Sequence, residues 1–211
     1  MDARNEAPFR AEHVGSLLRP RALVQARHDF TAGRIDAARL RKVEDDAIRD
    51  VVALQEDIGL RVATDGEFRR TSWHMDFIYR LGGVTRTDDE IVVTFRNDEG
   101  TGEFIAAGLA VRDRLHLAEP IFTDDFAFLA EQVRTAVPKM TLPSPSMVHF
   151  RAGTAAVDRS AYPDLDAFWA DLADTYADEI RALAAAGCRY LQLDDTSLAC
   201  LNDPAQRDML A

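Results

Sequence analysis

Arg189-Tyr190-Leu191-Gln192-Leu193-Asp194-Asp195-Thr196-Ser197 is a short apolar run that ends in two adjacent carboxylates. It follows a long helical pattern that closes at Gly187. This order predicts a helix, a tight turn, a buried strand and then polar groups at the carboxyl end of the strand. Because ligands bind at the carboxyl ends of strands in parallel α/β folds, Asp194 and Asp195 are the first candidate site residues. The alternative is that one of them only caps the following helix.

Similar strand patterns recur along the chain, at Ala11–Val14, Leu60–Thr64, Pro138–Leu142 and Tyr190–Leu193. Helical patterns separate them, over residues 20–30, 36–58, 69–81, 123–136 and 164–186. Strands that alternate with helices predict a parallel sheet with right-handed crossovers. Two β-like runs around a turn-rich stretch at 97–100 predict an antiparallel hairpin, inserted at about 84–120. No linker or internal repeat divides the sequence, so we expect residues 1–211 to form a single domain.

Composition and charge exclude several classes of partner. The chain has 211 residues, 47% of them apolar, which suits one soluble domain with a sizeable core. The net charge of -11 argues against nucleic acid or an anionic membrane, because both bind positive patches. The chain carries charges from Asp2 onward and contains no apolar stretch near ~20 residues. We therefore expect no signal peptide, no membrane span and a cytoplasmic location. The only lysines, Lys42 and Lys139, are interpreted as compositional bias toward arginine.

The residues that follow the predicted strands suggest a common binding rim. They are His13 and Ser16, Asp65 and Glu67, Ser144 and Ser146, and Asp194 and Asp195. Carboxylates and hydroxyls that converge in this way would suit a ligand with an ammonium group. Gly15 and Gly66 would let backbone N–H groups approach such a ligand closely.

Each of these residues also has a structural interpretation. Ser16 could cap the helix that begins near Pro20, and Asp65 is better explained as binding turn amides. His13 on a short strand is more often a supporting core group than a ligand. No set of His, Cys and Glu residues has convincing metal spacing, and the two cysteines, Cys188 and Cys200, form no Cys-x-x-Cys pair. We therefore expect no metal site within this chain.

Three motifs resemble cobalamin-independent methionine synthase, most closely its short single-barrel relatives. They are His13-Val14-Gly15-Ser16-Leu17-Leu18-Arg19-Pro20, Thr64-Asp65-Gly66-Glu67-Phe68-Arg69-Arg70 and Tyr190-Leu191-Gln192-Leu193-Asp194-Asp195-Thr196, in the order of the family. The resemblance implies a (β/α)8 TIM barrel, which typically has ~250 residues. It also implies transfer of a methyl group from a methylated folate to the thiol of homocysteine, which a zinc ion holds as thiolate.

The same resemblance implies roles for individual residues. Ser16, with the backbone of Gly15, would hold the carboxylate of the amino-acid substrate, and Glu67 and Asp194 would bind its ammonium group. His13 is typical of the short relatives, which leaves the thiol and the methyl donor open. No catalytic residue is assigned, and the zinc ligands of the family are expected beyond residue 211.

The resemblance also implies that the chain covers about the first four βα units, which are the N-terminal half of the barrel. We then expect it to be inactive alone and to need a second half-barrel or a homo-oligomeric partner. One alternative is a non-catalytic binding or assembly module. Another is a related barrel enzyme that acts on a different thiol or alkyl donor. A uroporphyrinogen decarboxylase barrel would need arginines arranged to clamp several carboxylates, and the three motifs match the synthases better.

Overall fold

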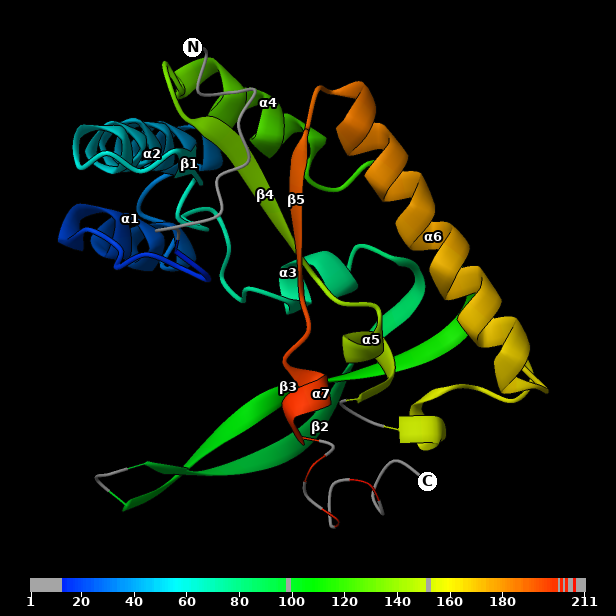
Figure 1. Ribbon diagram of the computed structural model, residues 1–211. Helices are drawn as coiled ribbons and strands as arrows, with labels where there is room; N and C mark the ends of the chain where they lie inside the picture. Colours follow the sequence, from blue (N-terminus) through cyan, green and yellow to red (C-terminus); the bar gives the residue numbers. More distant parts are fainter. Residues whose placement is uncertain are drawn as a thin grey trace. The chain divides into compact units, whose positions relative to one another are not determined.

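The structure is a computed structural model that describes residues 13–97, 100–150, 153–200, 202, 204 and 207, without the side chains of residues 89–107 and 199–200 (Figure 1). The chain forms two compact units, and each is described by itself. The first contains Met1–Trp73, Phe122–Thr141 and Leu183–Gln192, and the second contains His74–Ile121, Leu142–Ala182 and Leu193–Ala211. The single half-barrel domain stays a prediction.

Three helices of the first unit enclose its core. They are α1 (Arg21–Thr31), α2 (Ala37–Asp57) and α4 (Thr123–Gln132). α1 begins directly after Pro20, whose fixed φ suits a helix start. α2 begins where the side chain of Asp36 accepts the N–H of Arg39 at 2.8 Å. The predicted helices at 20–30 and 36–58 are confirmed, and their apolar faces meet around the fully buried Ile48 and Leu129.

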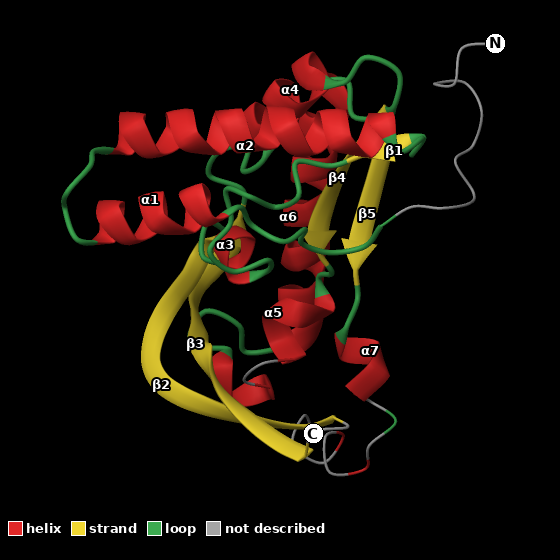
Figure 2. Cartoon of the chain, turned by 90° about the vertical axis from the view of Figure 1, so that its left-hand side faces the viewer, coloured by secondary structure: helices red, strands yellow, loops and turns green. Residues whose placement is uncertain are grey.

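The sheet has the order β1-β4-β5, from β1 (Val62–Ala63), β4 (Val137–Pro143) and β5 (Tyr190–Asp194). β1 and β4 are parallel, with Val62 opposite Val137, and the arrows of β4 and β5 point the same way in Figure 2. The predicted second, third and fourth strands are confirmed. The predicted first strand is not: Ala11 lies outside the described residues, and His13 and Val14 are not in a strand. Side-chain contacts, described below, fix that segment instead.

Glu56, near the end of α2, organises the turn that leads into β4. Its Oε1 accepts the main-chain N–H groups of residues 134–136, at 2.8, 2.6 and 2.9 Å. Its Oε2 accepts Nε of Arg134 at 3.0 Å. Burial acts to raise the pKa of Glu56, but these N–H donors outweigh it and lower the pKa to about 2. The carboxylate therefore joins α2 to β4 only while it is ionised.

We expect Glu56→Gln to lower the free energy of unfolding by about 1–3 kcal/mol at pH 7, since hydrogen bonds to a charged acceptor are lost. The folded-state pKa lies below the ordinary value of 4.5, so this stabilisation is present above that pH and is lost as the pH falls toward about 2. Urea denaturation between pH 7 and pH 3 would show the difference from wild type shrinking. Asp57→Asn, at the exposed neighbouring carboxylate, is the control. A difference that stays constant with pH would contradict the assignment.

The second unit is built on a long antiparallel hairpin, β2 (Gly82–Asn97) and β3 (Gly100–His116), which confirms the predicted hairpin (Figure 2). The other elements are α3 (Met75–Ile78), α5 (Ser146–Phe150), a 3₁₀ helix (Gly153–Ala156), α6 (Leu165–Ala185) and α7 (Ser197–Cys200). The core includes Phe168, whose ring meets that of Tyr162 edge-on at 5.6 Å. Within the described part of the chain, no helix has the length and apolar character needed to cross a membrane.

The predicted helix over 69–81 is wrong for most of its length, since only Met75–Ile78 is helical. The residues before it form a turn whose carbonyl groups bind side chains. The carbonyl of Arg70, for example, accepts Nη2 of Arg19 at 2.8 Å, where a helix would use a main-chain N–H. The apolar residues at 73–79 have helical spacing, but this spacing does not show that side chains compete for the carbonyl groups of the segment. Gly82 and Gly83, which follow the predicted helix, open β2.

Position 83 requires glycine, both because of its backbone angle and because there is no room for a side chain. Its φ is +88°, and a Cβ atom would lie 2.6 Å from the carbonyl oxygen of Asp113. Gly33 has a similar φ of +69° but open space around it. We expect Gly33→Ala to cost about 1–2 kcal/mol for the left-handed backbone alone, and Gly83→Ala to cost more because of the clash. Urea denaturation of the two variants measures the difference, and equal losses would show that the contact with β3 relaxes freely.

Candidate functional site

The turn that follows β1 holds Glu67 in an uncommon backbone conformation. Gly66 and Glu67 have φ angles of +67° and +57°, and Glu67 is the one non-glycine residue with positive φ in the described part of the chain. The hydroxyl of Thr64 accepts the N–H of Gly66 at 3.1 Å, and Oδ1 of Asp65 accepts the N–H of Glu67 at 2.8 Å. Such a conformation costs roughly 1–2 kcal/mol and is found mainly at functional sites.

Glu67 is 1% exposed, and its carboxylate has three partners. Ser16 Oγ donates to Oε2 at 2.6 Å, and Thr141 Oγ1 donates to Oε1 at 3.0 Å. Arg70 Nη1 lies 3.6 Å from Oε1. The structure thus brings together two of the predicted site residues, Ser16 and Glu67. Ser16 does not cap α1, because no side chain caps that helix.

Arg70 offsets the negative charge of Glu67 but does not occupy all of the acceptor sites of its carboxylate. Its Nη2 donates to the carbonyl of Thr141 at 2.7 Å, and its Nη1 donates to the carbonyl of Trp73 at 3.2 Å. Its guanidinium also stacks on the ring of Phe122, 4.3 Å from the centroid. An ionised carboxylate has about four acceptor sites, and two hydroxyls occupy two of them. Glu67 therefore keeps acceptor capacity for a ligand.

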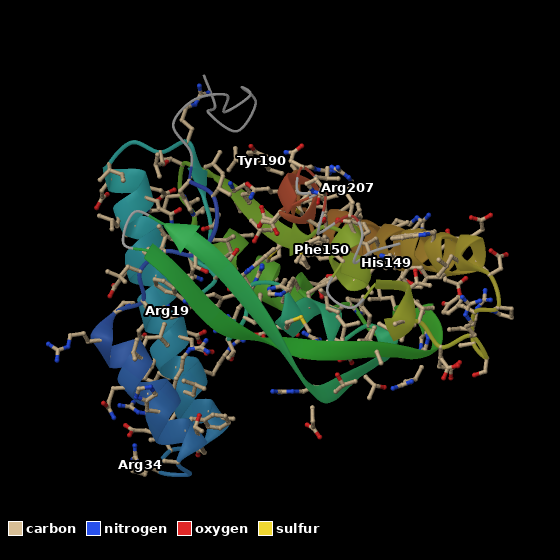
Figure 3. All side chains as sticks on the ribbon, turned by 90° about the horizontal axis from the view of Figure 1, so that it is seen from below. Arg19, Arg34, His149, Phe150, Tyr190 and Arg207 are labelled. Atoms are coloured by element: carbon tan, nitrogen blue, oxygen red, sulfur yellow. The ribbon has the colours of Figure 1, made fainter. Side chains whose placement is uncertain are left out.

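The segment that carries Ser16 is fastened to this turn by Arg19, which is labelled in Figure 3. Nη2 of Arg19 donates to the carbonyls of Glu67 and Arg70, at 2.9 and 2.8 Å. The N–H of Leu17 donates to the carbonyl of Gly66 at 3.2 Å. Residues 13–20 alternate between half-buried and exposed, as expected for an extended segment. Ser16 is consequently held beside the turn although it belongs to no helix or strand.

His13 and Lys139 form the other side of this arrangement. Nε2 of His13 lies 2.7 Å from Oγ1 of Thr64. Nζ of Lys139, on β4, donates to the carbonyl of His13 and to Oε1 of Gln192 on β5, each at 2.8 Å. Lys139 is 1% exposed. A buried lysine thus links two neighbouring strands to the segment that precedes α1.

Sequence reasoning missed the roles of Arg19, Arg70 and Lys139. From the sequence, Lys139 is interpreted as compositional bias, although it adjoins Met140–Pro143, a run that the structure buries completely. A lysine beside such a run was the available signal, because lysine is rarely buried without polar partners. Arg19 and Arg70 lie inside the motifs already singled out. No feature of the sequence shows that their partners are main-chain carbonyls.

Asp65 stabilises the turn by binding a main-chain amide, as the structural interpretation of this residue predicts. Oδ1 binds the N–H of Glu67, and the residue is buried. Burial raises the pKa of its carboxyl, and the positive charge of Arg70 and the Glu67 N–H act against that rise. Asp65 therefore fixes the backbone that presents Glu67.

Asp195 belongs to the second unit and binds the start of α7. Its Oδ1 accepts the hydroxyls of Ser146 and Ser197, at 3.0 and 2.7 Å, and the N–H of Leu198 at 3.3 Å. Burial acts to raise the pKa of Asp195, but the hydroxyls of Ser197 and Ser146 outweigh it and lower the pKa. These contacts match the capping alternative. The predicted role of Asp195 in ligand binding stays a prediction.

Asp194 and Gly15 keep their predicted roles as predictions. The carbonyl of Asp194 accepts the N–H of Ser144 at 3.0 Å, which joins the ends of β5 and β4 within the second unit. Gly15 has a φ of +80° and open space where a Cβ would lie, so backbone angle alone requires glycine there. His149, labelled in Figure 3, packs its ring 5.2 Å from that of Trp169, and burial lowers its pKa.

Among the residues that the structure describes, no group of three or more His, Cys, Asp and Glu side chains could hold a metal ion. Zinc sites use three or four such ligands, so these residues do not fit a zinc ion. The zinc ligands expected beyond residue 211 stay a prediction.

Comparison with known proteins identifies relatives along almost the whole chain. Residues 9–206 match the family described as cobalamin-independent synthase, catalytic domain. The uncharacterized protein YxjH of Bacillus subtilis is 39% identical over 209 residues, which are 99% of this chain and 54% of that protein. The methionine synthase of Pyrococcus horikoshii is 26% identical over 191 residues, which are 90% of this chain and 52% of that protein. The chain spans about half the length of the curated relatives it matches.

Solved structures show the same relationship. The putative vitamin-B12 independent methionine synthase from Listeria monocytogenes matches with a TM-score of 0.77 and 36% identity, over 97% of this chain and 59% of that one. A B12-independent methionine synthase from Shewanella sp. W3-18-1, solved in complex with selenomethionine, has 24% identity and a TM-score of 0.59 over 78% of this chain and 45% of its own, which supports the fold alone. The chain therefore belongs to the cobalamin-independent synthase family and has the α/β fold, with helices and a parallel sheet, of its solved relatives.

Proposed function

We propose that this chain is part of a (β/α)8 methyltransferase that moves a methyl group from a methylated folate to the thiol of an amino acid such as homocysteine, in methionine biosynthesis. Its contribution in the first unit is to bind the amino-acid end of the thiol substrate. The observation that carries the proposal is the buried carboxylate of Glu67, which the turn holds at a left-handed backbone position. Family membership supports the reaction class.

Glu67 suits the ammonium group of an amino acid. The carboxylate has a negative charge, and the hydroxyls of Ser16 and Thr141 use two of its about four acceptor sites. Each charge-assisted hydrogen bond from an ammonium group contributes roughly 1.5–3 kcal/mol. Because Glu67 is nearly inaccessible while Ser16 covers Oε2, the ligand reaches it by displacing the Ser16 hydroxyl.

The displaced hydroxyl then has a natural partner in the ligand. Ser16 would turn its O–H from Glu67 toward the ligand carboxylate, and the N–H of Gly15 in the same segment would add a second donor. One contact within the protein is thus exchanged for contacts at both ends of an α-amino acid. A ligand that lacked either charged group would leave Ser16 or Glu67 without its new partner, and this cost produces specificity.

We expect Glu67→Gln to weaken binding of L-methionine and L-homocysteine about 30-fold or more, because removing one partner of a buried charge pair costs about 2 kcal/mol or more. Glutamine keeps acceptor oxygen for Ser16 or Thr141, so the fold should survive. Isothermal titration calorimetry measures the affinities. Asp29→Asn, which changes a carboxylate on α1 that binds Arg34, should bind like wild type. Wild-type affinity in Glu67→Gln, or no binding by the unmodified chain, would overturn the proposal.

Substitutions at Asp194 and Asp195 should have different effects on ligand binding and on stability. Asp194→Asn is expected to weaken methionine binding. Asp195→Ala is expected to lower that free energy by about 1 kcal/mol, since the first turn of α7 loses its acceptor, and to bind methionine normally. Calorimetric titration and urea denaturation of both variants provide the two readings. The reverse pattern would assign ligand binding to Asp195 and a structural role to Asp194.

A further inference from the structure

We infer that the outer edge of β2 is a contact surface for a second copy of this chain, and that the two β2 strands pair antiparallel around a two-fold axis at Val93. This inference does not depend on the proposed function. It starts from the ribbon of β2 and β3, which is a sheet of two strands in the part of the chain that the structure describes. A two-stranded ribbon by itself is marginally stable in water. A further strand along one edge would therefore stabilise it.

A β-bulge divides the ribbon into two parts. The register shifts between Thr87 and Glu90, where β2 has two residues without a partner on β3. Before the bulge, the ribbon is held by its own unit, since the hydroxyl of Tyr79 donates to the carbonyl of Gly108 at 2.8 Å. Beyond the bulge, the ribbon extends away from α5, α6 and α7 (Figure 1). Because bulges bend a strand and interrupt its pairing, residues 90–97 are a separate pairing segment, the outer segment of β2.

The two edges of the ribbon differ in their main-chain contacts. On the β3 edge, Val111 forms an isolated parallel bridge with Val157, and its carbonyl accepts the N–H of Asp158 at 2.9 Å. Among the described residues, no strand or bridge pairs with the outer segment of β2 on its other edge. Natural proteins protect such an edge with proline, with charged residues or with a covering element. Residues 91–95 are Ile-Val-Val-Thr-Phe, a run that favours strands and contains neither proline nor charge.

The outer segment is complementary to itself when two copies run antiparallel. A two-fold axis through such a pair places one residue opposite itself. With Val93 at the axis, Glu90 of each copy lies opposite Arg96 of the other, so that opposite charges meet at both ends. The positions between them pair as Ile91 with Phe95 and Val92 with Thr94. Opposite charges, and aromatic residues opposite β-branched ones, stabilise an antiparallel pair. The partner that fits this edge is therefore the same edge of a second copy.

The neighbouring two-fold registers are less favourable. An axis one residue earlier would place Asp89 opposite Phe95. An axis one residue later would place Arg96 opposite Val92. Each of these registers sets a charged residue against an apolar one and gives up that favourable pair. The register centred on residue 93 instead sets charge against charge at both ends, and it stops where the bulge interrupts β2.

The antiparallel arrangement also leaves room for both copies. The seven paired residues, 90–96, span roughly 24 Å. β2 enters the ribbon at Gly82, beside the rest of its unit, so the second units of the two copies lie at opposite ends of the paired segment. The product is an antiparallel sheet of four strands in the order β3-β2-β2-β3, in which the β2 edge of each copy is paired. A sheet of this size is common in globular proteins.

Sedimentation equilibrium of the 211-residue chain tests the pairing. As the concentration is raised, the mass should approach twice the chain mass of 23.5 kDa. Glu90→Arg and Arg96→Glu should each raise the dissociation constant about tenfold or more, because each substitution reverses two ion pairs of the dimer. A mixture of the two variants should dimerise again, since every arginine then lies opposite a glutamate. Glu131→Arg, at an exposed position of α4, is the control and should dimerise like the unmodified chain.

The register is tested by disulfide cross-linking in a Cys200→Ser background, where the remaining Cys188 is buried. Residues directly opposite each other in an antiparallel pair are close enough for a disulfide, so mild oxidation should link two copies of Val93→Cys. Ile91→Cys should link far less, because its two copies would be roughly 13 Å apart along the strands. Non-reducing electrophoresis measures both, with Cys200→Ser alone as the blank.

Three results would overturn the inference. The first is a chain that stays monomeric at every concentration, which would leave the β2 edge to a different protein or to none. The second is a dimer that neither charge reversal weakens, or two variants whose mixture does not dimerise again. The third is equal cross-linking at positions 91 and 93, which would contradict the register.

Discussion

The carboxylate of Glu67 is a buried negative charge on a backbone conformation that side chains disfavour, and the neighbouring residues compensate for both costs. Burial of an ion without compensation costs several kcal/mol. Ser16, Thr141 and Arg70 supply two hydrogen bonds and an opposite charge. The backbone strain is offset separately, by the side chain of Asp65 on the N–H of Glu67. A carboxylate supported in this way is ready to accept a ligand without reorganising its own backbone.

Long cationic side chains hold residues 13–20 in place, as main-chain pairing between strands does elsewhere in the unit. Residues 13–20 have no regular secondary structure, so their position depends on contacts with the turn and the sheet. Arg19 binds two carbonyls of the turn, and Lys139 binds a carbonyl of the segment from β4. Buried donors of this kind specify one arrangement, because any other would leave a charge without acceptors. The separation between His13, Ser16 and the turn is thereby set by Arg19 and Lys139.

The sequence predicted those elements whose cause is periodic or local. Apolar spacing located α2, and β-like runs around a turn located the hairpin. The same logic failed at 69–81, where the side chain of Arg70 binds the carbonyl of Trp73 and the side chain of Arg19 binds the carbonyl of Arg70, so that neither carbonyl is left to a helix. Polar residues after predicted strands made Ser16 and Glu67 candidates, and the structure places their side chains in contact although His13 and Val14 form no strand. The support from Lys139 comes from residues 53 and 126 positions away in sequence, and no local pattern records such contacts.

Recognition of the amino acid and chemistry at its thiol make different demands on a protein. A zwitterion needs a fixed negative acceptor and hydrogen-bond donors near it, and in the proposed function Glu67 and Ser16 of the first unit supply them. Methyl transfer to a thiol needs the thiolate, because the neutral thiol is a weak nucleophile. The described residues include no cluster that could stabilise a thiolate on a metal, and Cys188 is a buried thiol whose pKa is raised by burial. In the proposed function, this chain binds the α-amino acid end of the ligand, and the reactive sulfur belongs to the substrate.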